Sequence, residues 1–219
     1  MKAVRCCDKQ VQVVDLPTPS GDGVRVKVHS AGICSSDLHM VGMGFDIPAT
    51  LGHEVAGVLA DGRAVALEPL APCGHCDMCV QGDYGLCRSG AAMIHGVGRD
   101  GGMAEEILVP ERCIVPLPNN VSAADACLVE PLAVAAHGIR RLGLQPGARV
   151  AIIGAGGVGL AAASVLTPHI DTVHVAARHD AQKAAAQRLG AALDPEGEYD
   201  VVIECAGNSA ALAEAARLC

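Results

Sequence analysis

The sequence predicts an α/β protein in two parts: a β-rich first part and a second part built on a parallel βαβ unit. Short runs that alternate apolar and polar residues, such as 24–28, are typical of antiparallel strands, and residues 1–30 as a whole suggest a hairpin-like arrangement. In the second part a buried strand, a glycine-rich turn and an alanine-rich helix follow one another directly. A Gln-Pro-Gly boundary at 145–147 separates the patterns, and we place the domains at 1–140 and 141–219.

Composition narrows the class of partner and the cellular compartment. The net charge of −8, with no basic run, argues against nucleic acid, and the three aromatic residues offer almost no surface for stacking bases. Four glycines interrupt the longest apolar run, 150–166, so we expect no membrane span, and residues 1–8 lack the apolar core of a secretory signal. We therefore expect a cytoplasmic protein whose eleven cysteines are thiols or metal ligands before they are disulfides.

Four cysteines form the most specific motif in the chain. They are spaced C-x2-C-x2-C-x7-C in a loop rich in Gly and Asp: Cys73, Cys76, Cys79 and Cys87. Four thiolates can close a tetrahedral shell around zinc and leave no open position, which predicts a structural site. An iron–sulfur cluster is the alternative, but the loop lacks the apolar surroundings that a low-potential cluster requires.

The segment 34–39 (Cys-Ser-Ser-Asp-Leu-His) brings a thiol, two hydroxyls, a carboxylate and an imidazole together after a predicted strand. Sulfur is a ligand that suits zinc, and the neighbouring hydroxyl and imidazole can carry a proton. The alternative is a strand-to-helix turn with a buried cysteine and capping serines. This segment alone favours the alternative, and the other motifs reverse that interpretation.

Three further ionisable residues occur in apolar surroundings. His53 and Glu54 lie beside an apolar strand, and consecutive residues of a regular strand point to opposite faces. They can bind one ion together only where the backbone is irregular, which Gly52 permits. A hydrogen-bonded core histidine is the alternative for His53. Glu130 stands in the apolar stretch 127–136, where the alternative is a surface turn of a helix expected to begin near Ser122.

A Gly-x-Gly-x-x-Gly motif at 154–159 lies directly between the strand 149–153 and a helix that ends at Leu166. In that position the glycines let the backbone and the helix N-terminus approach a pyrophosphate. A strand at 172–177, a helix at 180–189 and a strand at 199–205 extend the unit. The residues that we expect to bind a dinucleotide are Gly154, Gly156, Gly157, Val158, Gly159, Ala177 and Arg178.

The end of the second strand indicates which dinucleotide binds. Sites that prefer NAD usually carry an acidic residue there for the ribose 2′-hydroxyl. Here Ala177 and Arg178 occupy the position, and Asp180 is better placed to cap the next helix. A small residue followed by a cation fits a 2′-phosphate, which favours NADP(H); the alternative is a solvated Arg178.

In this order, Cys34, the 52–54 segment, the four-cysteine lobe, Glu130 and the glycine loop resemble the zinc-containing medium-chain dehydrogenase/reductase family. The resemblance is closest to its polyol and threonine dehydrogenase branch, because a glutamate stands where alcohol dehydrogenases have a third-ligand cysteine. It implies a GroES-like β-rich catalytic domain followed by a Rossmann domain. It also implies that Cys34 and His53 bind a catalytic zinc, with Glu54 or Glu130 completing the shell.

The same resemblance implies roles in the segment 34–39: Asp37 orients the zinc histidine, and Ser36 and His39 relay a proton. The implied activity is hydride transfer between a secondary alcohol or polyol and NADP(H), with one catalytic and one structural zinc. The alternatives are an amino-alcohol (threonine-type) dehydrogenase and a catalytically silent zinc-binding protein. Full-length relatives continue beyond the position of Cys219, so we expect part of a longer, homo-oligomeric enzyme, a dimer or tetramer.

Overall fold

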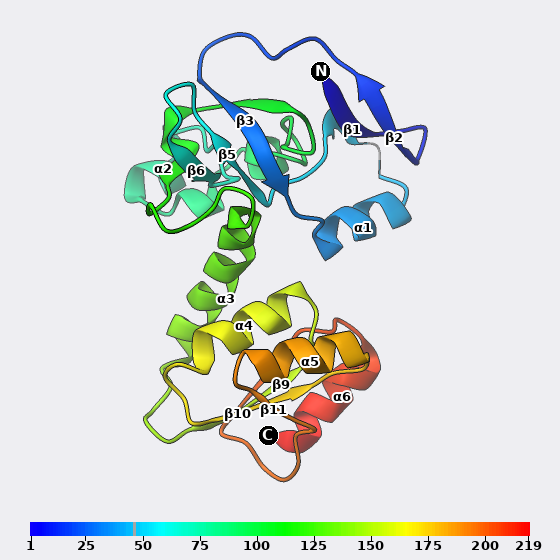
Figure 1. Ribbon diagram of the computed structural model, residues 1–219, viewed down its shortest axis with the longest axis vertical. Helices are drawn as coiled ribbons and strands as arrows, with labels where there is room; N and C mark the ends of the chain where they lie inside the picture. Colours follow the sequence, from blue (N-terminus) through cyan, green and yellow to red (C-terminus); the bar gives the residue numbers. More distant parts are fainter. Residues whose placement is uncertain (46) are drawn as a thin grey trace. The chain divides into compact units, whose positions relative to one another are not determined.

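The computed structural model describes residues 1–45 and 47–219 (Figure 1). Contacts between residues divide the chain into two compact units, Met1–Glu130 and Pro131–Cys219. The division falls within helix α3 (Val129–Leu142). The domain ranges 1–140 and 141–219 stay a prediction.

The first unit is built around a five-stranded antiparallel sheet in the order β7-β3-β5-β6-β8. Its strands are β3 (Val24–Ala31), β5 (Val55–Val58), β6 (Ala64–Leu67), β7 (Glu106–Val109) and β8 (Ile114–Pro116). One face buries a core of β-branched side chains, among them Val26, Val65 and Ile107. Such side chains pack well on a pleated surface, which is why these alternating segments form strands.

A smaller sheet, in the order β2-β1-β4, stands beside the first. The hairpin of β1 (Lys2–Cys7) and β2 (Gln10–Asp15) turns through Asp8 and Lys9, which both have positive φ, as a two-residue type I′ turn requires. The third strand is β4 (Ile47–Thr50). The suggestion of one hairpin-like arrangement over 1–30 is wrong for β3, which pairs with β5 and β7 because its apolar face belongs to the other core.

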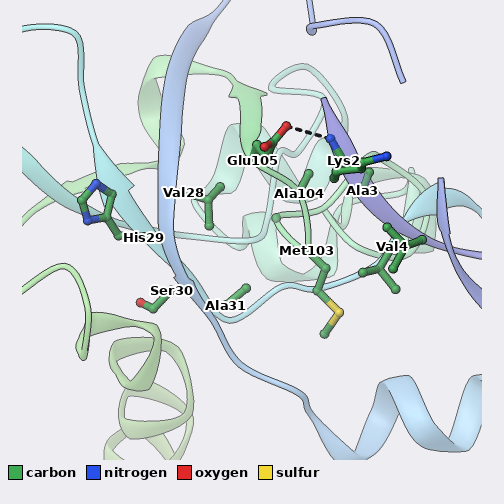
Figure 2. Close-up of a pocket in the computed structure, with 12 residues that line it drawn as sticks. Lys2, Ala3, Val4, Val28, His29, Ser30, Ala31, Met103, Ala104 and Glu105 are labelled. Atoms are coloured by element: carbon green, nitrogen blue, oxygen red, sulfur yellow. Dashed lines mark hydrogen bonds between the residues drawn. The ribbon is translucent and has the colours of Figure 1, made fainter. Parts of the chain in front are cut away.

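The segment before β7 joins the two sheets. Met103 accepts the backbone N–H of Val4 (2.8 Å), and Glu105 accepts that of Val28 (3.0 Å). A groove of about 400 Å³ opens along this seam, and Figure 2 shows the Glu105 side chain accepting the backbone N–H of Lys2 (2.7 Å) at its edge.

The cysteine-rich lobe carries short helices: α2 (Asp77–Gln81), η1 (Tyr84–Leu86) and η2 (Gly90–Met93). Arg112, in η3 (Glu111–Cys113), lies over the ring of Tyr84, with its guanidinium carbon 4.7 Å from the ring centroid. The same guanidinium donates to the carbonyl of Leu70 (2.6 Å). This cation–π contact anchors the lobe to the β-rich body.

Helix α3 begins at Val129, later than the predicted start near Ser122. Residues 122–128 form turns and η4 (Ala126–Leu128), and the Ser122 hydroxyl accepts the N–H of Ala124 (3.1 Å). Pro131 lacks an N–H and is accommodated in the first turn of a helix, so α3 starts close to it. Ala126 of η4 packs on the sheet face that carries Ala56 and Ala66.

The second unit holds a parallel sheet in the order β11-β10-β9-β12, which is the 3-2-1-4 order of a Rossmann fold. Its elements are β9 (Arg149–Ile153), α4 (Gly157–Leu166), β10 (Thr172–Ala176), α5 (Asp180–Arg188), β11 (Ala192–Leu193), β12 (Val201–Glu204) and α6 (Ser209–Leu218). Helices α4 and α5 cover one face and α6 the other, as Figure 1 shows. The predicted class, a GroES-like β-rich domain followed by a Rossmann domain, is confirmed.

None of the helices in residues 1–45 and 47–219 has both the length and the apolar content that a membrane crossing requires.

Candidate functional site

Three potential metal ligands from two segments of the chain lie close together in the first unit. Ligand atoms of Cys34, His53 and Glu54 all lie within 4.8 Å of one another. Cys34 is the N-cap of helix α1 (Ser35–Gly42), at the end of the turn that follows β3. His53 and Glu54 occupy a bend between β4 and β5, and Gly52 enters it with φ +94. The irregular backbone expected at Gly52 is therefore present, and it turns two consecutive side chains toward one point.

The donor set fits zinc. A thiolate sulfur, an imidazole nitrogen and a carboxylate oxygen are the ligand types of zinc sites, and three protein ligands leave a fourth position open. None of the three residues lines the groove along the seam. The chemistry-bearing cluster is thus a separate feature of the first unit.

The Asp37 carboxylate contacts two of these potential ligands, Cys34 and His53. Asp37 is 3% exposed, and one carboxylate oxygen accepts the backbone N–H of Cys34 (3.0 Å). The other oxygen lies 3.4 Å from Nδ1 of His53, and neither of these two atoms has a hydrogen-bond partner elsewhere in the described chain. The Asp37 contact raises the pKa of His53 to about 9; burial opposes this rise, and Cys34 adds to it. With Nδ1 directed at Asp37, Nε2 is the nitrogen left for a metal ion.

Ser36 and His39 lie on helix α1 beside the cluster. The Ser36 hydroxyl is 3.4 Å from Nε2 of His53, so it reaches the ligand cluster directly. His39 is exposed and follows Ser36 by three residues, a spacing that places both on one side of a helix.

Glu130 lies near the cluster but outside the group of three converging residues. It is partly buried in the first turn of α3. Burial raises the pKa of Glu130, and the charges of His53 and Glu54 also act on it, the first lowering the pKa and the second raising it. Of the two carboxylates that the sequence left open, Glu54 is the one whose oxygen meets Cys34 and His53.

The four lobe cysteines form a second cluster. Ligand atoms of Cys73, Cys76, Cys79 and Cys87 lie within 4.8 Å of one another. The Cys73 and Cys79 sulfurs are 3.9 Å apart, and the Cys76 and Cys87 sulfurs 4.0 Å. A tetrahedron with metal–sulfur bonds of about 2.3 Å has sulfur–sulfur edges of about 3.8 Å. The cluster therefore has the size of a closed four-thiolate zinc shell.

The four thiols differ in how readily they ionise, and backbone N–H groups favour the ionised form of Cys87. Cys73 and Ser89 donate to the Cys87 sulfur at 3.4 and 3.5 Å, and together they lower the pKa of that thiol to about 6. Burial raises the pKa of Cys79 to about 12. Thiolates crowded together repel one another, so a cation at the centre is what lets all four ionise.

Sequence reasoning missed the loop that supports His53. Positions 96 and 101 are glycines because a Cβ at Gly96 would lie 2.7 Å from the carbonyl carbon and oxygen of Gly52, and one at Gly101 would collide with that oxygen. Asp100, in the same loop, accepts the backbone N–H of Thr50 (2.8 Å). The glycine-rich run at 96–102 was the available signal, because glycines gather where backbones cross closely.

In the second unit the glycines of the 154–159 loop divide into two kinds. A Cβ at Gly154 would lie 2.9 Å from Ala206, and one at Gly159 would collide with the carbonyl of Gly154, so these two pack the turn. A Cβ at Gly156 or Gly157 meets no described atom within 4 Å. The open space therefore lies at the N-terminus of α4, where a pyrophosphate binds in such folds.

Ala177 and Arg178 follow β10, the strand next to β9. Ala177 is partly buried, and the Arg178 side chain is exposed. Asp180, the predicted cap, is the first residue of α5, and the observed N-cap is His179, one residue earlier. The sheet thus brings the small residue and the cation to the same edge as the glycine loop.

Comparison with known proteins shows which family this chain is similar to. The family model for the alcohol dehydrogenase GroES-like domain matches residues 20–119. Sorbitol dehydrogenase from Bacillus subtilis is 32% identical, over 94% of this chain and 68% of its own length. Among solved structures, a zinc-binding dehydrogenase from Sinorhizobium meliloti bound to NADP has a TM-score of 0.88 at 31% identity, covering 99% of this chain and 73% of that one.

An alcohol dehydrogenase from Escherichia coli CFT073 in complex with NADH has a TM-score of 0.82 at 30% identity, over all of this chain and 73% of that one. The chain spans about half the length of several curated relatives that it matches. The likeness extends across both units, including the glycine loop and the β-rich body. The chain belongs to the zinc-containing medium-chain dehydrogenase/reductase family, which includes polyol dehydrogenases.

Proposed function

We propose that the protein is a zinc-dependent dehydrogenase that transfers hydride between a secondary alcohol or polyol and NADP(H). The observation that carries this proposal is the convergence of Cys34, His53 and Glu54 within 4.8 Å. Three ligands with an open fourth position are the arrangement of a catalytic zinc site, whereas the four-cysteine cluster is closed and structural.

The residues around the centre take separate roles. Zinc at this site would act as a Lewis acid that lowers the pKa of a substrate hydroxyl. Asp37 holds the His53 ring through Nδ1 and the Cys34 backbone through its N–H, so both ligands stay oriented. Ser36, 3.4 Å from the His53 ring, accepts the hydroxyl proton as it gives its own proton to His39, and the exposed His39 releases a proton to solvent.

We favour polyols as the substrate class because Glu130 stands where the alcohol dehydrogenases that the chain resembles have a third-ligand cysteine. A carboxylate completes the shell, and Glu54 is our choice over Glu130 because its oxygen lies with Cys34 and His53. The resemblance to the polyol branch, and to the B. subtilis sorbitol dehydrogenase in particular, supports the same class.

For the cofactor we propose NADP(H) in preference to NAD(H). The Arg178 guanidinium is exposed at the β10 edge, and Ala177 leaves room for a 2′-phosphate. The open space at Gly156 and Gly157 fits the pyrophosphate. The S. meliloti relative holds NADP and the E. coli relative NADH, so the choice depends on this chain's own residues.

We further propose that residues 1–140 act as the catalytic domain and 141–219 as part of the dinucleotide-binding domain of a cytoplasmic homo-oligomer. The eleven cysteines, all present as free thiols in the structure, support a reducing compartment.

Metal analysis of purified protein tests the proposal. We expect two zinc ions per chain, one after Cys34→Ser, and two after the control Cys7→Ser, whose thiol lies in neither cluster. A panel of sugar alcohols with NADP+ should show activity for the wild type and the control, and none for Cys34→Ser. Equal zinc content in wild type and Cys34→Ser would refute the catalytic centre.

A further inference from the structure

Gly32 lies two residues before Cys34 and packs directly against Glu54. Its backbone N–H donates to the carbonyl of Glu54 (2.8 Å). A Cβ at Gly32 would lie 3.0 Å from the Glu54 Cβ and 3.1 Å from its Cδ, and it would collide with Oε2. The Glu54 carboxylate thus occupies the volume where any other residue at position 32 would place its side chain.

The backbone conformation does not explain the glycine. Fifteen glycines of the described chain have positive φ, a conformation that favours glycine, and Gly32 is not among them. Alanine could therefore adopt the Gly32 backbone without strain. The obstacle to a methyl group at this position is the Glu54 side chain itself.

We infer that Gly32 is a positioning residue whose missing side chain lets the Glu54 carboxylate reach Cys34 and His53. This inference rests on the proposed function, because it assigns Glu54 to the catalytic metal centre. The short segment 32–34 then fixes two ligands at once: Cys34 provides the thiolate, and Gly32 provides the space and the backbone N–H that hold Glu54.

The physical consequence is specific. A methyl at position 32 must push the carboxylate away, since close-packed atoms cannot overlap and the side chain is the part that can rotate. The backbone N–H to the Glu54 carbonyl can remain. We therefore expect Gly32→Ala to remove one ligand from the centre while Cys34 and His53 stay in place.

The test measures metal affinity rather than turnover. Gly32→Ala is compared with Gly42→Ala, because a Cβ at Gly42, also outside the positive-φ set, meets no described atom within 4 Å. Competition with a zinc chelator should show affinity at the Cys34 centre reduced about 10- to 100-fold in Gly32→Ala, the range for lost metal-site support, and unchanged in Gly42→Ala. The Co²⁺-substituted protein should show an altered visible spectrum in Gly32→Ala only.

A second background isolates the Glu54 side chain. In Glu54→Ala, adding Gly32→Ala should change zinc affinity less than about twofold, because the group it displaces is already gone. An equal loss in both backgrounds, or no loss in either, would overturn the inference. If Gly32→Ala alone fails to fold by circular dichroism, it is combined with Glu54→Gly, which also removes the Cβ that would lie 3.0 Å away. A folded double variant then supports the steric contact, and an unfolded one refutes it.

The two proposals fail in different ways. A wild type that binds only the lobe zinc refutes the proposed function. A wild type with two zinc ions, together with a Gly32→Ala variant of normal affinity and normal Co²⁺ spectrum, refutes only the role of Gly32.

Discussion

The Asp37 carboxylate holds His53 and Cys34 at the same time: one oxygen lies 3.4 Å from the His53 Nδ1, and the other accepts the Cys34 N–H at 3.0 Å. Both contacts come from a side chain that is almost fully buried. A charge is buried at this depth only where partners stabilise it, and here the partners are the ligands of the proposed metal centre.

Replacing Asp37 by Asn should weaken zinc binding at the Cys34 centre about 10- to 100-fold, since the amide keeps the shape but loses the charge that orients the His53 ring. Chelator competition measures the change. Asp22→Asn, in an exposed loop, is the control and should bind as the wild type does. An Asp37→Asn protein with wild-type affinity would show that the contact is not needed to hold the metal.

Dialysis against chelator should remove the Cys34-centre metal before the lobe metal. The first site has one thiolate, one imidazole and one carboxylate, whereas the lobe has four thiolates with N–H donors to their sulfurs. We expect zinc content to fall from two to one per chain in a fast phase that Cys34→Ser lacks. A fast phase of equal size in Cys34→Ser would mean that the lobe releases its metal first.

Arg178→Ala should weaken NADPH binding about 10- to 100-fold, because a charged hydrogen bond to phosphate contributes about 1.5–3 kcal/mol. NADH binding should change less than about twofold, since that cofactor has no 2′-phosphate. Titration of cofactor fluorescence measures both. Arg188→Ala, at the far end of α5, is the matched control. Equal losses for the two cofactors would argue against a 2′-phosphate contact.

Two glycines of one loop should respond differently to alanine. Gly159→Ala forces a methyl against the Gly154 carbonyl and should lower the free energy of unfolding by about 1–3 kcal/mol. Gly157→Ala meets no described atom and should keep its stability, yet it should bind NADPH more weakly because the methyl enters the pyrophosphate space. Urea unfolding and cofactor titration give the two readings. A destabilised Gly157→Ala with normal cofactor affinity would contradict this division.

His95 should make the fold sensitive to mild acid. The residue is buried, and its Nδ1 lies 2.8 Å from the Asp100 carbonyl. Burial lowers the pKa of His95 below the ordinary 6.5; the Arg99 charge also lowers this pKa, and Asp100 raises it. The unfolded chain then binds a proton more readily, so the free energy of unfolding falls as pH drops below about 6.5.

Replacing His95 by Asn removes this titration. Between pH 7 and pH 5 the stability of His95→Asn should fall less than that of the wild type, as urea unfolding at each pH would show. Parallel pH profiles for the two proteins would exclude His95 as the source of the acid sensitivity.

Local patterns in the sequence were sufficient wherever the chemistry depends on neighbours along the chain. The cysteine spacing predicted a cluster whose four sulfurs do converge, and the glycine motif between strand and helix predicted β9, α4 and the open space between them. The start of α3 and the pairing of β3 were misjudged, because a 3-10 turn before Pro131 and a partner strand far along the chain leave little local trace.

The sequence by itself determined the two-part α/β organisation, the four-cysteine lobe, the glycine loop and the set of residues able to bind metal. Only the tertiary structure decided that Glu54 rather than Glu130 meets Cys34 and His53, that the buried Asp37 contacts two of the proposed ligands, and that Gly32 leaves room for the carboxylate. The reason is physical: ligand geometry depends on distances between segments that are remote in sequence. Those distances are set by the packing of β3, β4 and β5 and not by the residues at the site alone.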